Sequence, residues 1–156
     1  MSYCDLEKVD VNEMPVGKLI AILARAQATY FNHMLSEIGI NDPQLHILFE
    51  INKDSKINQD KIASRCNTNK GAVARSIKKL EENGLVTRTI DENNRRQNII
   101  TLTQKGSQTL DKAIGMLDEL ESYLFEDDNE KQALQIILRD LSIKVMKLND
   151  DRFGKK

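Results

Sequence analysis

A change of hydrophobic period after Gly84 constrains the fold of this chain more than any other feature of its sequence. Before Gly84, apolar residues recur every three or four positions, as in amphipathic helices. After it, the segments LVTRTI and NIITLT, rich in β-branched residues, bracket the polar stretch DENNRRQ. This pattern predicts a β-hairpin with a long loop. The loop holds Arg95 and Arg96 side by side, although the chain has a net charge of −1.

Two short helices are predicted immediately before the hairpin. Asn58 is the expected N-cap of the first, and Asn67 is the expected turn residue after it, because asparagine tolerates left-handed backbone dihedrals. Thr68 or Asn69 caps the second helix, which Asn83–Gly84 ends.

The second of these helices has an apolar and a basic face. Val73, Ile77 and Leu80 stand at i, i+4 and i+7, so we expect them to face inward. The residues then left facing outward are Lys70, Arg75, Ser76 and Lys79.

Longer helices are predicted at both ends of the chain. The first spans residues 15–38 and ends at Gly39, and Asp42 then serves as N-cap of a further helix with Pro43 in its first turn. Thr103 caps the first of two C-terminal helices, and the turn FEDDNE separates them. Their leucines recur in steps of three and four, a pattern that favours packing against other helices.

The charge distribution points to a polyanionic partner. Residues 65–96 hold eight Lys or Arg against four Asp or Glu, a net charge of +4, so the rest of the chain carries −5. A basic patch on an acidic body is typical of proteins that bind nucleic acid. The alternative interpretation is a solvated surface of mixed charge.

Two short helices joined by a tight turn and followed by a two-stranded wing make a winged helix-turn-helix. The major groove of DNA admits one helix, and the wing can place an arginine in the minor groove. We therefore predict a single domain over residues 1–156. It is mainly α with a two- to three-stranded β wing. Residues 41–103 form the winged helix-turn-helix, and residues 12–40 and 104–150 form helices that flank it.

Residues 58–106 resemble the MarR family of transcriptional regulators. The segment "NQDKIASRCNTNKGAVARSIKKLEENGLVTRTIDENNRRQNIITLTQKG" is similar to that family's recognition helix, wing and following "L-T-x-k-G". The matching positions are Arg75, Leu80, Glu81, Gly84, Leu85, Val86, Arg88, Asp91, Arg95, Arg96, Leu102, Thr103 and Gly106.

The resemblance implies a homodimer, with the flanking helices as its dimerisation helices and one DNA-reading unit in each protomer. It also implies binding to a pseudo-palindromic operator in double-stranded DNA, usually as a repressor that a small phenolic ligand or oxidation releases. The expected DNA-binding residues are Thr68, Asn69, Lys70, Arg75, Ser76, Lys79, Arg95 and Arg96.

Several of these residues have an ordinary alternative role. The two arginines of the wing loop could belong to a solvated turn, and Lys79 could pair with Glu81 or Glu82. An effector pocket, which the resemblance places between the dimer helices and the DNA-reading unit, is expected to involve Tyr30, His33 and His46. A packed aromatic ring and surface histidines account for these three residues equally well.

The two cysteines and two histidines are too few to indicate a catalytic or metal site. Cys66 is expected to pack in the core, and Cys4 is a candidate redox thiol in the N-terminal arm, so a thiol-based redox regulator is an alternative function. A winged-helix protein-interaction module is another alternative function.

Two histidines provide few groups for acid–base catalysis, and a complete zinc site is hard to assemble from them, so we predict no enzyme, no metal and no cofactor. We also predict no membrane segment and, from the few cysteines, a cytoplasmic location.

Overall fold

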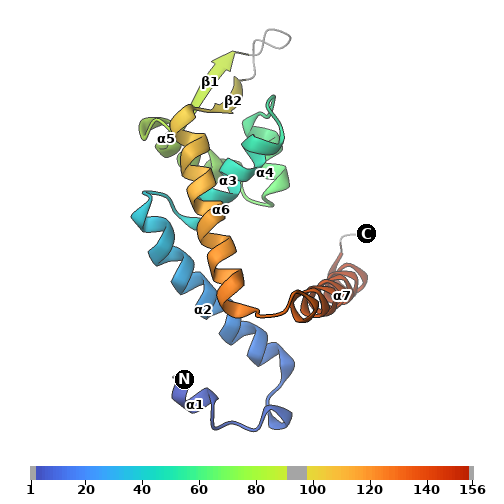
Figure 1. Cartoon of the computed structure of the whole chain (residues 1–156). Coiled ribbons are helices and arrows are strands. Elements are labelled where there is room, and N and C mark those ends of the chain that lie inside the picture. The colour runs from blue at the N-terminus through green and yellow to red at the C-terminus, as the bar shows by residue number, and fades with distance from the viewer. Residues whose placement is uncertain (1–2, 91–97, 155–156) are drawn as a thin grey trace. The chain divides into compact units, whose positions relative to one another are not determined.

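The computed structural model describes residues 3–90 and 98–154 of the 156 in the chain. The elements in order are α1 (Tyr3–Leu6), the 3-10 helix η1 (Val11–Glu13), α2 (Val16–Glu37), α3 (Asp42–Lys53), α4 (Gln59–Arg65), α5 (Lys70–Glu82), β1 (Val86–Ile90), β2 (Asn98–Leu102), α6 (Gln104–Leu124) and α7 (Asp128–Phe153) (Figure 1). The chain forms two compact units, Met1–Ile114 and Gly115–Lys156. The predicted mainly α fold with a small wing is confirmed.

The core of the first unit lies where α3, α4 and α5 meet the two-stranded sheet. Helix α3 contacts α4, α5 and β2, and α5 contacts β1. The strands pair antiparallel, with Val86 opposite Leu102 and Arg88 opposite Ile100, and a single bridge from Ile57 to Ile100 takes the place of a third strand. The large side chains that are fully buried are Leu35, Leu48, Ile57, Ile62, Val73, Ile77, Leu80, Val86, Ile100 and Leu110.

The N-cap of α3 is Asn41, so the prediction of Asp42 was wrong. The Asn41 side chain accepts a hydrogen bond from the backbone N–H of Gln44 at 3.1 Å, and the Gln44 side chain accepts one from Asn41 N–H at 3.0 Å. This reciprocal capping box satisfies two backbone donors at once, which a lone Asp42 cap would not do. Asp42 instead begins the helix, and Pro43 follows in its first turn.

The first long helix, α2, is one residue shorter at each end than the predicted 15–38, with Pro15 as its N-cap. The predicted boundaries at Asn58, Asn67 and Gly84 are confirmed. Asn58 caps α4 by accepting a hydrogen bond from Lys61 N–H at 2.9 Å, and Asn67 has a positive φ of 48° in the turn before α5. Gly84 follows α5 with a φ of 72°, a conformation that glycine adopts without strain from a Cβ atom.

Thr103 joins the end of the wing to α6. Its hydroxyl accepts a hydrogen bond from Gly106 N–H at 2.9 Å and donates one to the carbonyl oxygen of Gly84 at 2.7 Å. The ammonium group of Lys105 also donates to the Asn83 carbonyl oxygen at 2.9 Å. The predicted cap at Thr103 is therefore confirmed, and the same residue holds the start of α6 against the turn between α5 and β1.

Arg65 links the end of α4 to the end of α3. Its guanidinium lies 3.0 Å from an Asp54 carboxylate oxygen and 3.5 Å from a Glu50 oxygen. Asp54 also accepts a hydrogen bond from Lys56 N–H at 3.1 Å. The backbone N–H of Lys56, followed by the Arg65 side chain, holds the pKa of Asp54 below its ordinary value of 3.8.

This pKa predicts how Asp54 contributes to stability as the pH changes. A carboxyl group whose pKa is lowered by folding stabilises the native state above its unfolded pKa, and the contribution is lost as pH falls through the folded pKa. Asp54→Asn should therefore lower the melting temperature at pH 6. The difference from wild type should shrink as the pH falls below 3.8 and vanish once the pH passes below the lowered pKa of the folded state. Thermal unfolding from pH 6 to pH 2 checks this, with the exposed Asp111→Asn as control. A difference that stays constant with pH would refute the assignment.

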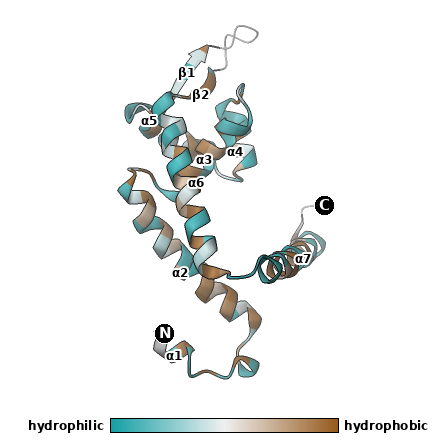
Figure 2. Cartoon of the chain, in the orientation of Figure 1, coloured by the Kyte–Doolittle hydropathy of each residue, from teal (hydrophilic) through white to brown (hydrophobic). Residues whose placement is uncertain are grey.

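The second unit contains the end of α6 and all of α7. Asp127 caps α7 by accepting a hydrogen bond from Asn129 N–H at 2.9 Å, and the turn predicted at FEDDNE is confirmed. Lys131 pairs with Glu121, and this hydrogen bond raises the pKa of Lys131. Helix α7 spans 26 residues, none of them buried, and hydrophobic residues recur along it (Figure 2). Several of its large apolar side chains, among them Ile137, Val145 and Leu148, are exposed in the single chain.

Candidate nucleic-acid interface

Helix α5 buries one face and exposes a basic one. Val73, Ile77 and Leu80 are buried against α3, α4 and β1, as predicted. Lys70, Arg75 and Lys79 are exposed, and Ser76 is half-buried. A helix that is fixed by its apolar face and presents cations outward has the geometry required to enter the major groove.

Thr68 and Asn69 shape the start of α5. The Thr68 hydroxyl donates a hydrogen bond to the Cys66 carbonyl oxygen at 3.0 Å, and the Asn69 side-chain oxygen accepts one from Ala72 N–H at 2.7 Å. Asn69 is therefore the cap of α5, which resolves the choice between the two residues. Both side chains are exposed, and the cap uses only the oxygen of the Asn69 amide.

Lys70 forms an exposed ion pair across the turn. Its ammonium nitrogen lies 2.8 Å from an Asp60 carboxylate oxygen on α4. Exposed pairs of this kind contribute about 0–1 kcal/mol, so a phosphate group could replace Asp60 as the partner of Lys70 at little cost.

The wing begins immediately after α5. The hydroxyl oxygens of Thr87 and Thr101 lie 3.0 Å apart across the two strands. Arg95 and Arg96, the predicted DNA-binding residues of the wing, lie outside the described residues. The other six predicted DNA-binding residues fall within a continuous segment, from Thr68 to Lys79.

An ion pair that the sequence analysis missed joins α5 to the wing. Arg88 Nε on β1 lies 3.0 Å from a Glu81 carboxylate oxygen, and Lys78 lies 3.8 Å from Glu82 within α5. Glu81 and Glu82, considered above as partners of Lys79, thus pair with other residues. The feature of the sequence that could have indicated this pair is an acidic residue in the last turn of a predicted helix, Glu81, with an arginine seven positions later in the following strand, Arg88.

Known proteins match this arrangement in both sequence and structure. The MarR family profile matches residues 40–97. The HTH-type transcriptional regulator BilQ of Clostridium symbiosum (strain WAL-14163) is 30% identical over 102 residues, which make up 65% of this chain and 71% of BilQ. The chain belongs to the MarR family. It is a transcriptional regulator that carries a DNA-binding winged helix.

Other similar proteins extend the match along the chain. An uncharacterized HTH-type transcriptional regulator of Bacillus subtilis (strain 168), YwoH, is 29% identical over 118 residues, covering 74% of this chain and 85% of its own. A crystal structure of MarR superposes with a TM-score of 0.74 at 25% identity, covering 92% of this chain and 98% of that one. A mutant MarR from E. coli, complexed with operator DNA, gives a TM-score of 0.71 at 22% identity, covering 85% and 99%.

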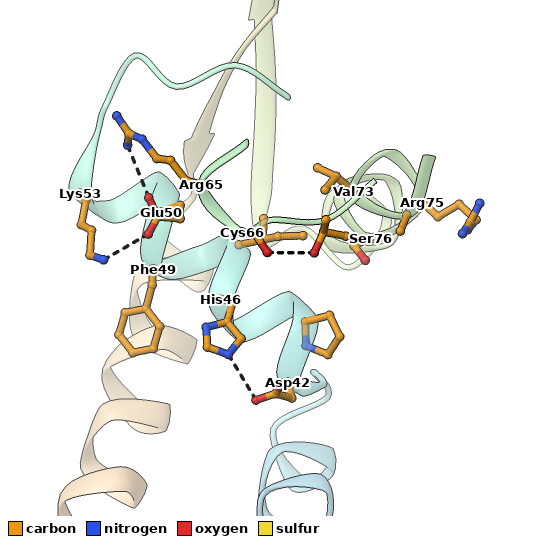
Figure 3. Close-up of a pocket in the computed structure, with 14 residues that line it drawn as sticks. Asp42, His46, Phe49, Glu50, Lys53, Arg65, Cys66, Val73, Arg75 and Ser76 are labelled. Atoms are coloured by element: carbon orange, nitrogen blue, oxygen red, sulfur yellow. Dashed lines mark hydrogen bonds and ion pairs between the residues drawn. The ribbon is translucent and has the colours of Figure 1, made fainter. Parts of the chain in front are cut away.

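A cavity of about 620 Å³ lies between α3 and α5 of this MarR-family chain (Figure 3). Its apolar wall includes Ile47, Phe49 and Val73, and the ion pairs of Glu50 with Lys53 and Arg65 lie along its rim. This volume falls within the range of small-molecule sites in proteins, about 300–1,000 Å³.

Of the three residues predicted for an effector pocket, His46 lines this cavity. Its Nε2 atom lies 3.6 Å from an Asp42 carboxylate oxygen one turn earlier on α3. Tyr30 and His33 lie on α2 and are not among the residues that line it. The Tyr30 ring instead packs edge-on against Phe31, with the ring centroids 6.0 Å apart.

Cys66 lies on the wall of the cavity, half-buried, rather than fully within the core as the sequence suggested. Burial, and then the negative charge of Glu50, raises the pKa of the Cys66 thiol above its ordinary value of 9.0. A raised pKa disfavours the thiolate, which is the reactive form. The side chain of Cys4, the candidate redox thiol, lies outside what the structure describes.

This environment predicts slow alkylation of Cys66. In a Cys4→Ser background, the rate of alkylation by iodoacetamide should be low at pH 7–8 and should still be rising above pH 9, because the thiolate fraction increases until the pH passes the raised pKa of Cys66. Glu50→Gln should increase the rate by removing the charge that opposes ionisation, whereas the exposed Glu119→Gln should not. Mass spectrometry of the modified protein measures this. Fast alkylation at pH 7 in the Cys4→Ser protein would contradict the prediction.

The described residues contain neither a cluster of metal ligands nor a helix that could span a membrane. Within residues 3–90 and 98–154, no three His, Cys, Asp or Glu side chains come together as metal ligands would. None of the helices in those residues combines the length and the apolar character that a membrane span requires.

Proposed function

We propose that this MarR-family regulator is a homodimeric repressor that binds a pseudo-palindromic operator in double-stranded DNA. The observation that carries the proposal is the basic outer face of α5, with Lys70, Arg75 and Lys79 exposed over a fully buried inner face. The N-terminal residues of the recognition helix read base edges in helix-turn-helix proteins, and the cations contact phosphates. In this proposal one of the wing arginines, Arg95 or Arg96, reaches the adjoining minor groove, and the other braces the loop or contacts a phosphate.

Two structural relatives support DNA as the partner. The mutant MarR from E. coli was crystallised with operator DNA, and a MepR mutant of S. aureus, with a TM-score of 0.61 at 20% identity, is bound to an oligodeoxyribonucleotide. In this proposal the chain uses the same winged helix for the same kind of partner.

Exposed apolar side chains on the outer helices support a homodimer. Leu23 on α2 is 45% exposed, and Ile137 and Val145 on α7 are 54% and 57% exposed. Monomeric proteins rarely expose extended apolar patches. A second copy of the chain would cover these helices, so residues 1–156 would act as one dimer-forming domain, with 12–40 and 104–150 as its dimerisation helices and 41–103 as the winged helix-turn-helix.

The cavity between α3 and α5 supports control by a small ligand. A molecule held there would contact Val73 and Ser76 on α5 as well as His46 on α3, so it could change the position of the recognition helix. Control by a ligand requires that the effector bind the DNA-bound and DNA-free forms of the protein with different affinities. The difference is typically about 1–3 kcal/mol. In this proposal the effector binds in the cavity. Tyr30 and His33 contact the effector only if dimerisation brings α2 to the edge of the cavity.

Selection of genomic DNA fragments with the purified protein, followed by footprinting, tests the proposal. A dimer with two recognition helices should protect two inverted half-sites whose centres are roughly 34–36 Å apart. Protection of one isolated half-site, or no enrichment of any sequence over random fragments, would rule out a dimeric operator-binding protein.

A further inference from the structure

We infer that Glu81 and Arg88 are positioning residues that fix the wing relative to the recognition helix and so control DNA affinity without contacting DNA. The inference rests on the proposed function, because it concerns how the same DNA-binding surface is assembled.

The pair connects the last turn of α5 to the middle of the wing's first strand. Side chains alternate along β1, so Arg88 shares a face with Val86, which is buried. On that face Arg88 Nε comes within 3.0 Å of a Glu81 oxygen, with the two side chains 28% and 42% exposed. Among the ion pairs of the described residues, this one alone joins α5 to β1.

Strand β1 pairs with β2 along its whole length, but backbone hydrogen bonds tie it to the end of α5 only at its start. Leu85 N–H donates to the Leu80 carbonyl oxygen at 2.9 Å, and Thr103 N–H donates to the Leu85 carbonyl oxygen at 3.0 Å. From Val86 to Ile90 the strand extends about 13 Å at 3.3 Å per residue. Because the two strands are paired, a small rotation of the hairpin relative to α5 would displace its outer end more than its base. Arg88, two residues beyond the start, is placed to prevent that rotation.

The environment of Arg88 makes Glu81 difficult to replace. The Nε atom of Arg88 is inaccessible to solvent, and it donates no well-aligned hydrogen bond within the described part of the chain. The carboxylate of Glu81, 3.0 Å away, therefore provides the negative charge that offsets the burial of this cationic nitrogen. Loss of Glu81 would leave a buried nitrogen of a cation without a counter-charge, which favours turning the side chain toward solvent. The contact between the helix and the wing would then be lost.

The sign of the expected effect separates positioning from direct contact. Glu81 is an anion and repels phosphate, so its removal should strengthen DNA binding if only charge mattered. Glu82 is a matched control, because it is adjacent, exposed and acidic, but pairs with Lys78 inside α5 instead of with the wing. The variants Glu81→Gln and Glu82→Gln change the total charge equally and differ only in which pair they break.

Fluorescence anisotropy with a selected operator duplex tests the inference. Glu81→Gln should bind about tenfold more weakly than Glu82→Gln, and Arg88→Gln should show a similar loss. If wing contacts are lost, the slope of log affinity against log salt should become shallower for Glu81→Gln, changing from about −9 toward −5. A loss of folded protein alone would leave the slope unchanged. The exchange Glu81→Arg with Arg88→Glu should recover most of the affinity.

Three outcomes have distinct meanings. Equal affinities and slopes for Glu81→Gln and Glu82→Gln would overturn the inference while leaving the proposed function in place. Failure of the exchanged pair to recover any affinity would also overturn it, because Arg88 would then be a direct phosphate contact. Wild-type protein that binds no duplex would overturn the proposed function itself.

Discussion

Replacing Gly106 with alanine should destabilise the protein by about 3 kcal/mol, the upper part of the range for an overpacked site. A Cβ atom at position 106 would lie 1.9 Å from the carbonyl oxygen of Leu85. That oxygen is fixed, because it accepts a hydrogen bond from Thr103 N–H at 3.0 Å. Backbone atoms cannot move aside as the end of a flexible side chain can. The start of α6 would therefore separate from the turn between α5 and β1.

Gly115→Ala on the same helix is the matched control. Nothing lies within 4 Å of a Cβ atom at that position, and alanine favours helix over glycine by about 0.5–1 kcal/mol. Urea unfolding at one protein concentration should show Gly106→Ala less stable than wild type and Gly115→Ala more stable. Equal changes in the two variants would show that the close contact at Gly106 is not part of the folded protein.

Replacing Arg75 with alanine should weaken operator binding by about 1–3 kcal/mol, roughly fivefold to 150-fold. Arg75 is exposed on the outer face of α5. Its Nη1 atom lies 3.6 Å from where a Cβ atom on Gly71 would stand, so the guanidinium extends back toward the first turn of the helix. The beginning of a recognition helix is the part that approaches base edges.

The exposed Lys18→Ala on α2 is the control for Arg75→Ala, because it removes the same charge from a helix that is not proposed to meet DNA. Anisotropy titrations on the operator and on an unrelated duplex should show a large loss for Arg75→Ala on the operator and little change for Lys18→Ala. Similar losses for the two variants would mean that net charge, and not the α5 surface, accounts for binding.

The parts of the fold that depend on local sequence were predictable. The inner face of α5 follows from the spacing of Val73, Ile77 and Leu80, and its end follows from Gly84, whose positive φ suits glycine. The cap of α3 was assigned one residue too late. Two adjacent residues, Asn41 and Asp42, can both cap a helix, and only the side chain of Gln44, reaching back to Asn41, distinguishes them.

The parts that depend on how elements meet were not predictable from one sequence. The pairing of Glu81 with Arg88 requires the direction in which β1 leaves Gly84, which helical or strand periodicity does not provide. The cavity depends on the gap between α3 and α5, so the sequence could suggest His46 but could not exclude Tyr30 and His33 from its wall. For the same reason Cys66, expected in the core, lies on the cavity wall.

The salt dependence of duplex binding by the purified protein measures the central proposal most directly. Five cations in each chain, Lys70, Arg75, Lys79, Arg95 and Arg96, would neutralise about ten phosphates in a dimer, which corresponds to a slope of log affinity against log salt near −9. A protein that sediments as a dimer and gives that slope agrees with a basic DNA-reading surface present once in each protomer. A monomer in solution, or an affinity that does not change with salt, would contradict it.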